Sequence, residues 1–212
     1  FEGSQLAVTA TDHIVNAGGG IIKGQQVDLT AERGTILNQR TVTTHESTDA
    51  AGYNRVDFVS EASRIEADGN LNMTAGYNIE NRGSAITAGT ASLTAGNNIE
   101  NTAVAATQER NIVNGKNISN KEQITQYGSL ISVEEDLTAR AGNNFQTTGS
   151  HVEAGNNIDI RVGNDIIADA AANEYHMSGS SRKVNAKTDI VEQQGSSIVA
   201  GNDMVLGANN DI

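Results

Sequence analysis

Apolar residues in this chain alternate with polar ones in short runs, and the runs are separated by clusters of Gly, Asn and Asp. The stretch 65–79 shows the pattern most clearly. Its apolar positions are Ile65, Ala67, Leu71, Met73, Ala75 and Ile79. A spacing of two residues is typical of half-buried strands, whereas an amphipathic helix would show a period of 3.6. The pattern therefore predicts three short strands joined by sharp turns.

The same pattern returns along the chain. It recurs in residues 131–145 and 198–212, at shifts of 66 and 67 residues, and copies also begin at Ile86 and Val152, 21 residues after their neighbours. Three strands in about 21 residues make one rung of a parallel β-helix, in which each strand pairs with its equivalent in the next rung at roughly 4.8 Å. Alanine recurs at two inward positions of each unit, and only 3% of the residues are aromatic. These features predict an all-β solenoid with a thin core filled by Ile, Leu, Val and Ala.

The turns of each unit contain Gly and Asn, as in Gly76–Asn78 and Gly96–Asn98. Both residue types tolerate the backbone conformations of tight turns, and stacked Asn side chains can hydrogen-bond along the axis of the solenoid. These asparagines could instead bind calcium or sugar. Because these asparagines recur in every unit, a structural role in the turns is favoured over a binding role.

Every second step between units is too long by about 22 to 25 residues. The units start at Ile22, Ile65, Ile86, Ile131, Val152 and Ile198. The extra segments lie near residues 39–62, 102–128 and 168–195, so that the full repeat is about 66 residues long. Each is polar, contains a Gly turn and has alternating apolar flanks, which predicts β-hairpins that project from, or lie along, one side of the solenoid.

The hairpins carry the candidate contact residues, because an exposed Tyr near Arg or Lys can contact carbohydrate or protein. The residues concerned are Tyr53, Arg55, Arg110, Lys116, Tyr127, Tyr175, Arg182 and Lys183. The alternative is that the hairpins shield a sheet flank and bind nothing.

Composition and charge disfavour several classes of site and binding partner. The 212 residues include no Pro and no Cys, which suits a periodic array and excludes disulfides and thiolate metal sites. A formal charge of −12 with scattered Lys and Arg disfavours nucleic-acid binding, and no apolar run is long enough to span a membrane. We recognise no signal-peptide pattern in these residues, and the sequence begins and ends inside the repeat pattern. We therefore expect residues 1–212 to be a single β-helical segment of a longer array.

An enzyme is the competing class, because parallel β-helices also host polysaccharide lyases and glycosidases that use clustered carboxylates. At the outward positions compared, Glu66 is followed by Thr87 and Ser132 by Glu153, so that no acidic pair aligns on consecutive plain rungs. His45-Glu46 lacks a third partner. We therefore expect no catalytic, cofactor or metal site.

Two further binding classes are disfavoured by pattern. Gly18-Gly19-Gly20 is followed by Ile-Ile-Lys, so the ligands of a calcium β-roll are absent. An ice-binding face would need a regular Thr ladder, and Thr74, Thr94 and Thr138 are expected not to share one register.

The units Ala88–Ile99 and Ala154–Ile166, with the form Ala-Gly-x-x-Leu-x-Leu-x-Ala-Gly-x-x-Ile, resemble the filamentous haemagglutinin repeat. The resemblance covers essentially the whole chain. It implies a right-handed β-helical filament, secreted across a Gram-negative outer membrane by a two-partner transporter. The resemblance also implies that the chain functions as the shaft of an adhesin at the cell surface. Its receptor would be a glycan or protein on host or bacterial cells. The stalk or delivery segment of a contact-dependent growth-inhibition exoprotein is the alternative within the family.

Overall fold

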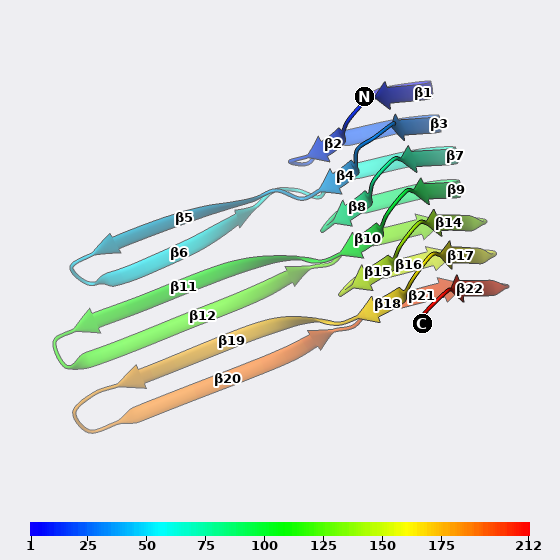
Figure 1. Ribbon diagram of the computed structural model, residues 1–212. Coiled ribbons are helices and arrows are strands. Elements are labelled where there is room, and N and C mark those ends of the chain that lie inside the picture. The colour runs from blue at the N-terminus through cyan, green and yellow to red at the C-terminus, as the bar shows by residue number, and fades with distance from the viewer.

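The fold is a parallel β-helix with three hairpins outside it, as a computed structural model of residues 1–212 shows (Figure 1). This confirms the predicted fold class. The larger solenoid sheet is formed by β1 (Glu2–Ala10), β3 (Ile21–Ala31), β7 (Arg64–Ala75), β9 (Ala85–Ala95), β13 (Leu130–Val133), β14 (Leu137–Ala141), β16 (His151–Ala154), β17 (Ile158–Val162), β21 (Ser197–Ala200) and β22 (Met204–Ala208). The smaller one is formed by β2 (Ile14–Ala17), β4 (Ile36–Gln39), β8 (Ile79–Arg82), β10 (Ile99–Thr102), β15 (Phe145–Thr148) and β18 (Ile166–Asp169). Each rung thus passes along the larger sheet, turns a corner and returns through the smaller one.

The predicted units stack residue on residue. Ile65 pairs with Ile22 on one side and with Ile86 on the other. The column continues through Ile131, Val152 and Ile198. The unit that starts at Ile86 is one residue shorter than its neighbour, and the register between β7 and β9 shifts between Ala67 and Asn70 to absorb the difference. A bulge therefore keeps the apolar positions of both rungs pointing inward.

The core is one continuous column of small and branched apolar side chains. Its cluster holds 30 buried residues, among them Leu71, Met73 and Phe145, each at most 1% exposed. Buried alanines, such as Ala67, Ala88 and Ala154, stack beside the larger residues. The alternation that predicted the strands thus also describes which side chains are removed from water.

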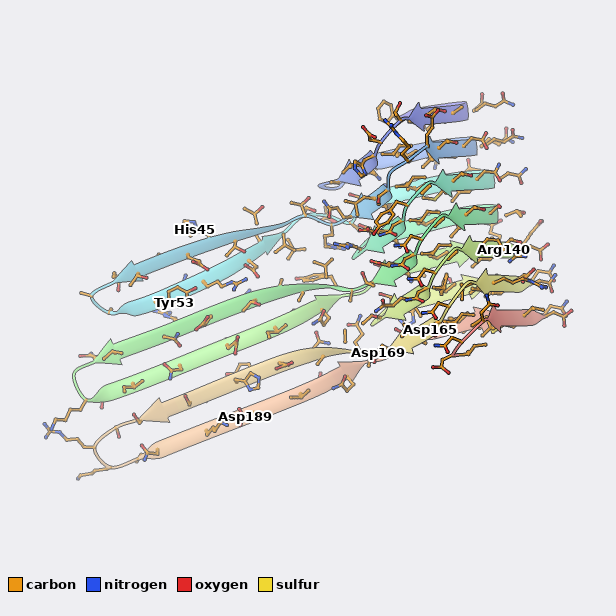
Figure 2. All side chains as sticks on the ribbon, in the orientation of Figure 1. His45, Tyr53, Arg140, Asp165, Asp169 and Asp189 are labelled. Atoms are coloured by element: carbon orange, nitrogen blue, oxygen red, sulfur yellow. The ribbon has the colours of Figure 1, made fainter.

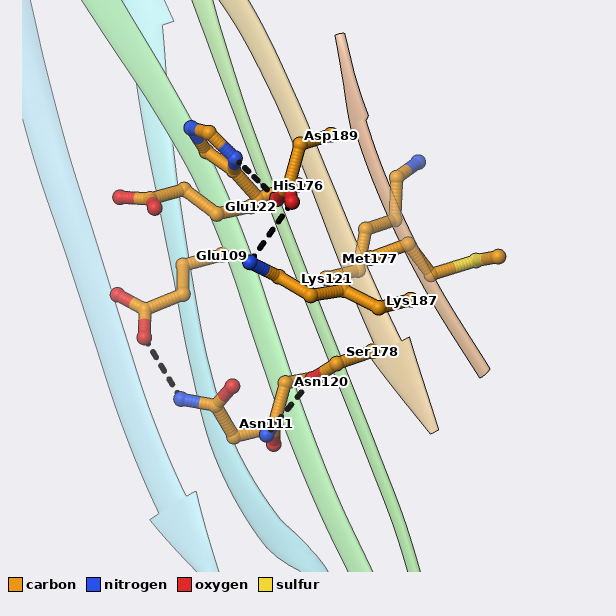
Figure 3. A pocket seen from close by; sticks show the side chains of 10 residues that line it. All are labelled: Glu109, Asn111, Asn120, Lys121, Glu122, His176, Met177, Ser178, Lys187 and Asp189. Carbon is orange, nitrogen blue, oxygen red and sulfur yellow. Dashed lines mark hydrogen bonds and ion pairs between the residues drawn. The ribbon is translucent and has the colours of Figure 1, made fainter. Parts of the chain in front are cut away.

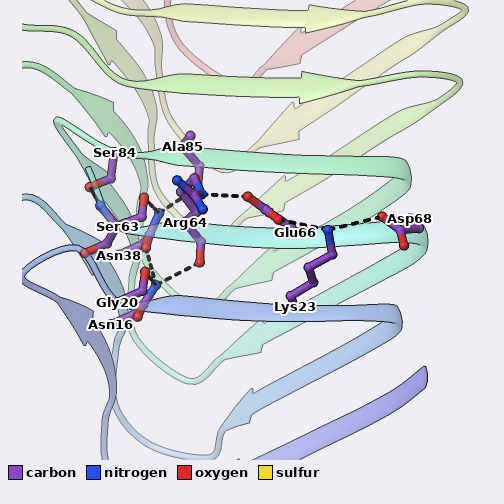
Figure 4. A network of polar contacts seen from close by, with 10 residues as sticks. All are labelled: Asn16, Gly20, Lys23, Asn38, Ser63, Arg64, Glu66, Asp68, Ser84 and Ala85. Atoms are coloured by element: carbon purple, nitrogen blue, oxygen red, sulfur yellow. Dashed lines mark hydrogen bonds and ion pairs between the residues drawn. The ribbon is translucent and has the colours of Figure 1, made fainter. Parts of the chain in front are cut away.

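A ladder of buried asparagines runs through the corner between the two solenoid sheets, and Figure 4 shows its first two members, Asn16 and Asn38. Asn16 donates to Asn38, Asn38 to Asn81 and Asn81 to Asn101, each over 2.9 Å. The same amides also donate to backbone carbonyls, as Asn38 does to Ala85, and no buried side-chain polar atom of the molecule lacks a partner. The ladder therefore satisfies polar groups that a solenoid corner would otherwise bury unpaired.

The turn asparagines form a second ladder, as predicted. Asn97 donates to Asn78 over 2.9 Å, and Asn143 donates to Asn98 over 3.0 Å. As predicted, Thr74, Thr94 and Thr138 do not all share one register, although Thr74 and Thr94 stand in one outward column with Thr9 and Thr30. Thr138 belongs to the neighbouring column, beside Ser92, and the threonine column ends where Arg140 pairs with Thr94.

The corner that follows the smaller sheet alternates between a tight glycine turn and a hairpin. Gly83 and Gly149 make the tight turns at φ +57° and +55°. A Cβ on Gly149 would lie 2.5 Å from the Cβ of Ala171, at the base of a hairpin. Two rungs advance the solenoid by roughly 9.6 Å, which is also the width of two paired strands. One hairpin on every second rung therefore fills the available space and meets the next hairpin edge to edge.

Candidate interaction surface on the hairpin sheet

The three hairpins form a sheet of their own. They are β5–β6 (Val42–Asp49 and Gly52–Val59), β11–β12 (Val104–Asn114 and Asn117–Tyr127) and β19–β20 (Ala171–Ser180 and Asn185–Gln194). The six strands are antiparallel throughout, in the order β5, β6, β11, β12, β19 and β20. The sheet projects sideways from the solenoid (Figure 1). The hairpins therefore pair with one another and do not cover a solenoid face.

One row across this sheet carries a charged or titratable residue on every strand. The row runs Glu46, Arg55, Glu109, Glu122, His176 and Asp189. Strand alternation places the residues two positions away on the same face, which adds Asp57, Glu174 and Lys187. We call these nine residues the acidic face. Its six carboxylates outnumber its two permanent cations, Arg55 and Lys187.

His176 lies at the centre of the ion pairs on this face (Figure 3). Its Nε2 is 2.9 Å from Glu174 Oε2, and its Nδ1 is 2.9 Å from Asp189 Oδ1. The hydrogen bonds to Glu174 and Asp189 raise the pKa of the imidazole above its usual value. The Lys187 ammonium, 2.7 Å from Asp189, lowers the pKa of that carboxyl together with His176. Protonated His176 therefore links the two strands of the third hairpin electrostatically.

An open depression of about 280 Å³ surrounds this histidine. Its ten lining residues include Glu109, Glu122 and Lys121 from the second hairpin, and only one of the ten is hydrophobic. No group of three or more His, Cys, Asp or Glu side chains in the molecule is placed to hold a metal ion. The depression is thus a polar surface feature that suits hydrogen bonding with a large partner better than enclosure of a small molecule.

Asp57 joins the first hairpin to the second. The Asp57 side chain is 3% exposed, and its carboxylate accepts hydrogen bonds from the Thr44 hydroxyl over 2.7 Å and from the Thr107 amide over 2.8 Å. Arg55 lies 3.3 Å from it. Burial alone would raise the pKa of this carboxyl, but the bonds from Thr44, Thr107 and Arg55 outweigh burial and lower it. The ionised carboxylate thus connects β5, β6 and β11.

The predicted contact residues fall into three groups. Tyr53, labelled in Figure 2, and Arg110 line a depression of about 290 Å³ between the first two hairpins. Lys116, Arg182 and Lys183 line a groove of about 540 Å³ between the turns of the second and third hairpins. The structure therefore brings five of the eight residues to two shared surfaces.

The other three predicted residues contact neighbouring side chains. Arg55 is held by Asp57. Tyr127 lies at the base of its hairpin, with the Arg40 guanidinium 5.0 Å from its ring centroid, and Lys121 lies 5.5 Å from the ring of Tyr175. Each of these two cation–π contacts places a cation against one face of a tyrosine ring.

Sequence reasoning missed His176 and its carboxylates. Their signal was the spacing of the hairpins, because aligning them strand against strand brings Glu122, His176 and Asp189 into one row. The pairing between hairpins was not predicted, so the sequence alone did not place His176 beside these carboxylates.

One pair of acidic residues does align on the solenoid surface. Glu80 and Glu100 stand side by side on consecutive rungs, and Arg82 contacts both, at 2.8 Å and 3.6 Å. The expectation that no acidic pair aligns was therefore wrong, because the comparison left out the smaller sheet. Asn78 and Asn98 donate further hydrogen bonds to these two carboxylates. The shared arginine offsets one of the two negative charges, and each carboxylate also accepts a hydrogen bond from an amide, so the pair is engaged in surface contacts.

A similar neutralisation occurs on the larger sheet. Asp159 lies between two arginines, at 2.5 Å from Arg140 and 3.0 Å from Arg161. The hydrogen bond from Arg140 is the main cause of the lowered pKa of this carboxyl. Glu80, Glu100 and Asp159 line none of the three depressions described on the hairpin sheet. The molecule also contains no helix with the length and apolarity needed to cross a membrane.

Comparison with known proteins supports the interpretation of the repeats. Residues 112–190 match the family model described as the hemagglutinin repeat. Over 199 residues the chain is 26% identical to the tRNA nuclease CdiA of Escherichia coli (strain STEC_O31), and the match covers 92% of this chain but 6% of that protein. No solved structure matches the chain.

The match to the repeat model begins in β11 and ends in β20, so it includes two plain rungs and parts of two hairpins. The similarity to the longer protein extends over nearly all the rungs. Residues 112–190 therefore match the hemagglutinin repeat, and the stacked units and recurring hairpins on either side of them support the resemblance of the chain to filamentous-haemagglutinin-like repeats.

Proposed function

We propose that the chain is a shaft and presentation segment of a secreted, cell-surface exoprotein, and that the hairpin sheet is the surface it presents. The observation that carries the proposal is that the hairpins pair with each other in a separate six-stranded sheet. A hairpin that only shielded a solenoid face would lie against it. Here most of the β5 and β20 side chains are exposed.

The solenoid supports the shaft function. Its strands are hydrogen-bonded in parallel from rung to rung, and each rung extends the molecule by roughly 4.8 Å along the axis. Stability in such arrays comes from neighbouring repeats, so length can grow without a new core. Each 66-residue repeat would then add two rungs and one hairpin to the presented surface.

The resemblance to filamentous haemagglutinins supports a route and a location. We infer that the parent chain passes through an outer-membrane transporter of the two-partner type and reaches the surface of a Gram-negative cell. The receptor in the adhesin proposal is a glycan or protein on a host or bacterial cell. The hairpin residues Tyr53, Arg110, Lys116, Arg182 and Lys183 are the proposed contacts.

The second candidate is the stalk or delivery segment of a contact-dependent growth-inhibition exoprotein. It is favoured by the similarity to a protein named as a tRNA nuclease. Because the chain spans 6% of that protein, the nuclease activity is not transferred to this segment. We infer that the segment itself is not an enzyme, since its aligned carboxylates, Glu80 and Glu100, are already engaged by Arg82 and by hydrogen bonds from two asparagine amides.

A binding assay with labelled protein tests the presentation proposal. The chain is compared with a variant whose three hairpins are each replaced by a short Gly-Asn turn, after circular dichroism has shown that the variant is folded. Epithelial cells and Gram-negative bacteria serve as targets. Saturable binding that is lost with the hairpins is the expected result, whereas undiminished binding of the trimmed variant would assign adhesion to the solenoid. If neither protein binds, the presentation function fails and only the shaft function remains.

A further inference from the structure

The turn of the second hairpin contains the sequence Asn114-Gly115, and no other asparagine of the chain precedes a glycine. The turn joins β11 to β12, which pair as far as Asn114 and Asn117. Gly115 has φ +61°, and a glycine with positive φ at the first central position is typical of a type II′ hairpin turn. The asparagine side chain therefore stands directly before a residue that has no Cβ to shield its backbone nitrogen.

Nothing in the molecule holds this dipeptide in place. Both residues are exposed, and a Cβ on Gly115 would meet no atom within 4 Å. The Gly115 N–H donates no hydrogen bond, and the Asn114 side chain takes part in none. Asn111 in the same hairpin differs, because its side chain donates to Glu109 over 2.6 Å. The carboxamide of Asn114 and the backbone nitrogen of Gly115 are thus free to approach each other.

The asparagines of the solenoid turns are in the opposite situation, because the backbone N–H that follows each of them is engaged by a neighbouring rung. The N–H that follows Asn143 donates to the Asn98 side chain over 3.1 Å. The N–H that follows Asn144 donates to the Asp165 carbonyl over 3.0 Å. The same arrangement recurs at residues 156–157, between β16 and β17. A nitrogen whose proton is held in this way is a poor nucleophile, so the turn ladder protects its own asparagines.

We propose that Asn114 is a site of spontaneous deamidation. The Gly115 nitrogen gives up its proton to hydroxide or water and attacks Cγ of Asn114, so that an N–Cγ bond forms. The Cγ–Nδ2 bond breaks, and Nδ2 takes up a proton and leaves as ammonia. Water then opens the succinimide ring: attack at Cγ gives aspartate, and attack at the backbone carbonyl carbon gives isoaspartate. Each conversion consumes one water and releases one ammonia, and no electrons are transferred.

Either product changes the end of the second hairpin. The new carboxylate adds a negative charge close to Lys116, which lines the groove between the second and third hairpin turns. In isoaspartate the main chain runs through Cβ and Cγ, and this longer path no longer fits a two-residue turn. β12 also pairs with β19 as far as Ile118, so a loosened turn reaches the third hairpin. The reaction needs only water, and it is therefore independent of whether the hairpins bind a receptor.

Peptide mass spectrometry of the 212-residue chain, after prolonged incubation at neutral pH, tests the proposal. Trypsin cleaves after Arg110 and Lys116 and so releases residues 111–116 as one peptide. Conversion raises its mass by about 1 Da, and the aspartate and isoaspartate forms separate by chromatography. The tryptic peptide of residues 141–161 contains four turn-ladder asparagines and is the internal reference. Synthetic peptides of both sequences give the rates in the absence of the fold.

We expect residues 111–116 of the folded chain to convert at a rate comparable to that of the synthetic peptide, with isoaspartate as the main product. Residues 141–161 of the folded chain should keep their amides over the same period. Asn114→Gln should abolish the conversion, because the longer side chain would have to close a larger ring. Gly115→Ala should slow it severalfold, since a Cβ then shields the nitrogen. Both positions are exposed, so circular dichroism should show both variants folded.

Three results would overturn the proposal. The first is that Asn114 keeps its amide in the folded chain while the synthetic peptide converts, because the turn would then protect its asparagine. The second is that fragmentation of the tryptic peptide places the conversion at Asn111. The third is that the peptide of residues 141–161 converts as readily in the folded chain as residues 111–116 do, since the hydrogen bonds of the ladder would then make no difference.

Discussion

Asn38 donates a hydrogen bond of 2.9 Å to Asn81, although the two residues are 43 positions apart and both are 0% exposed. The first hairpin lies between them in the sequence. The chain therefore leaves the solenoid for a full hairpin and returns to the same column. Such a contact holds the rungs in register across each excursion, and it underlies the first prediction.

Replacing Asn81 with Leu should destabilise the solenoid strongly. Asn81 accepts from Asn38 and donates to Asn101, Ser84 and Leu130. Its loss leaves several buried polar groups unpaired, at about 1–3 kcal/mol for each. Urea unfolding measures the change. Asn72→Leu is the control, because Asn72 donates to Asp28 on the exposed surface. Equal midpoints for the two variants would contradict the ladder.

Replacing Leu71 with Asp should disrupt the rungs on either side of it. Leu71 is 1% exposed and pairs with Val27 and Ala91 in the neighbouring rungs. A carboxylate there would be buried without a partner, and even Leu71→Ala should cost about 2–5 kcal/mol. Thermal melting by circular dichroism gives the result. An unchanged melt for Leu71→Asp would show that the rung register is wrong.

Two glycine substitutions separate backbone strain from crowding. Gly149 and Gly115 have similar φ values, +55° and +61°, but a Cβ on Gly149 would meet Ala171 at 2.5 Å, whereas one on Gly115 would meet nothing within 4 Å. Both changes to Ala should cost about 1–2 kcal/mol from the backbone. Gly149→Ala should cost about 1–3 kcal/mol more from overpacking. Denaturant unfolding of the two variants, compared with the parent, tests whether the tight corner depends on the adjacent hairpin base.

The third hairpin should loosen as pH rises. The pKa of His176 is raised by Glu174 and Asp189, so its contribution to stability is fully present below the unfolded pKa of about 6.5 and is lost as pH rises through the folded pKa. The residues that face it from neighbouring strands are Glu122 on β12 and Asp189 on β20, whose second partner is Lys187. Above the folded pKa, the neutral imidazole no longer offsets these carboxylates.

Hydrogen exchange in β19 and β20, together with an NMR titration of His176, measures this effect. Intrinsic exchange rates must be corrected for pH. Because the histidine is partly exposed, the change should be local, and His176→Gln should abolish it. Exchange in the solenoid strands serves as the internal reference. A His176 pKa at or below the ordinary value would refute the prediction.

The hairpin sheet shows where sequence reasoning reached its limit. Each hairpin could be recognised from its Gly turn and alternating flanks, because these are local signals. The pairing of β6 with β11 and of β12 with β19 depends on how far the solenoid advances between excursions. That distance follows from rung stacking, so the row from Glu46 to Asp189 was not predicted.

The sequence by itself determined the period, the inward positions and the turns, because alternation and Gly/Asn spacing act within a few residues of the chain. Tertiary structure decided which residues of different rungs and hairpins meet. It placed Glu80 beside Glu100, Thr74 beside Thr94 and Lys116 near Arg182. The physical reason is that the spacing between strands sets these contacts. Two rungs of the solenoid and two strands of a hairpin have the same width, and this equality exists only once the rungs are stacked.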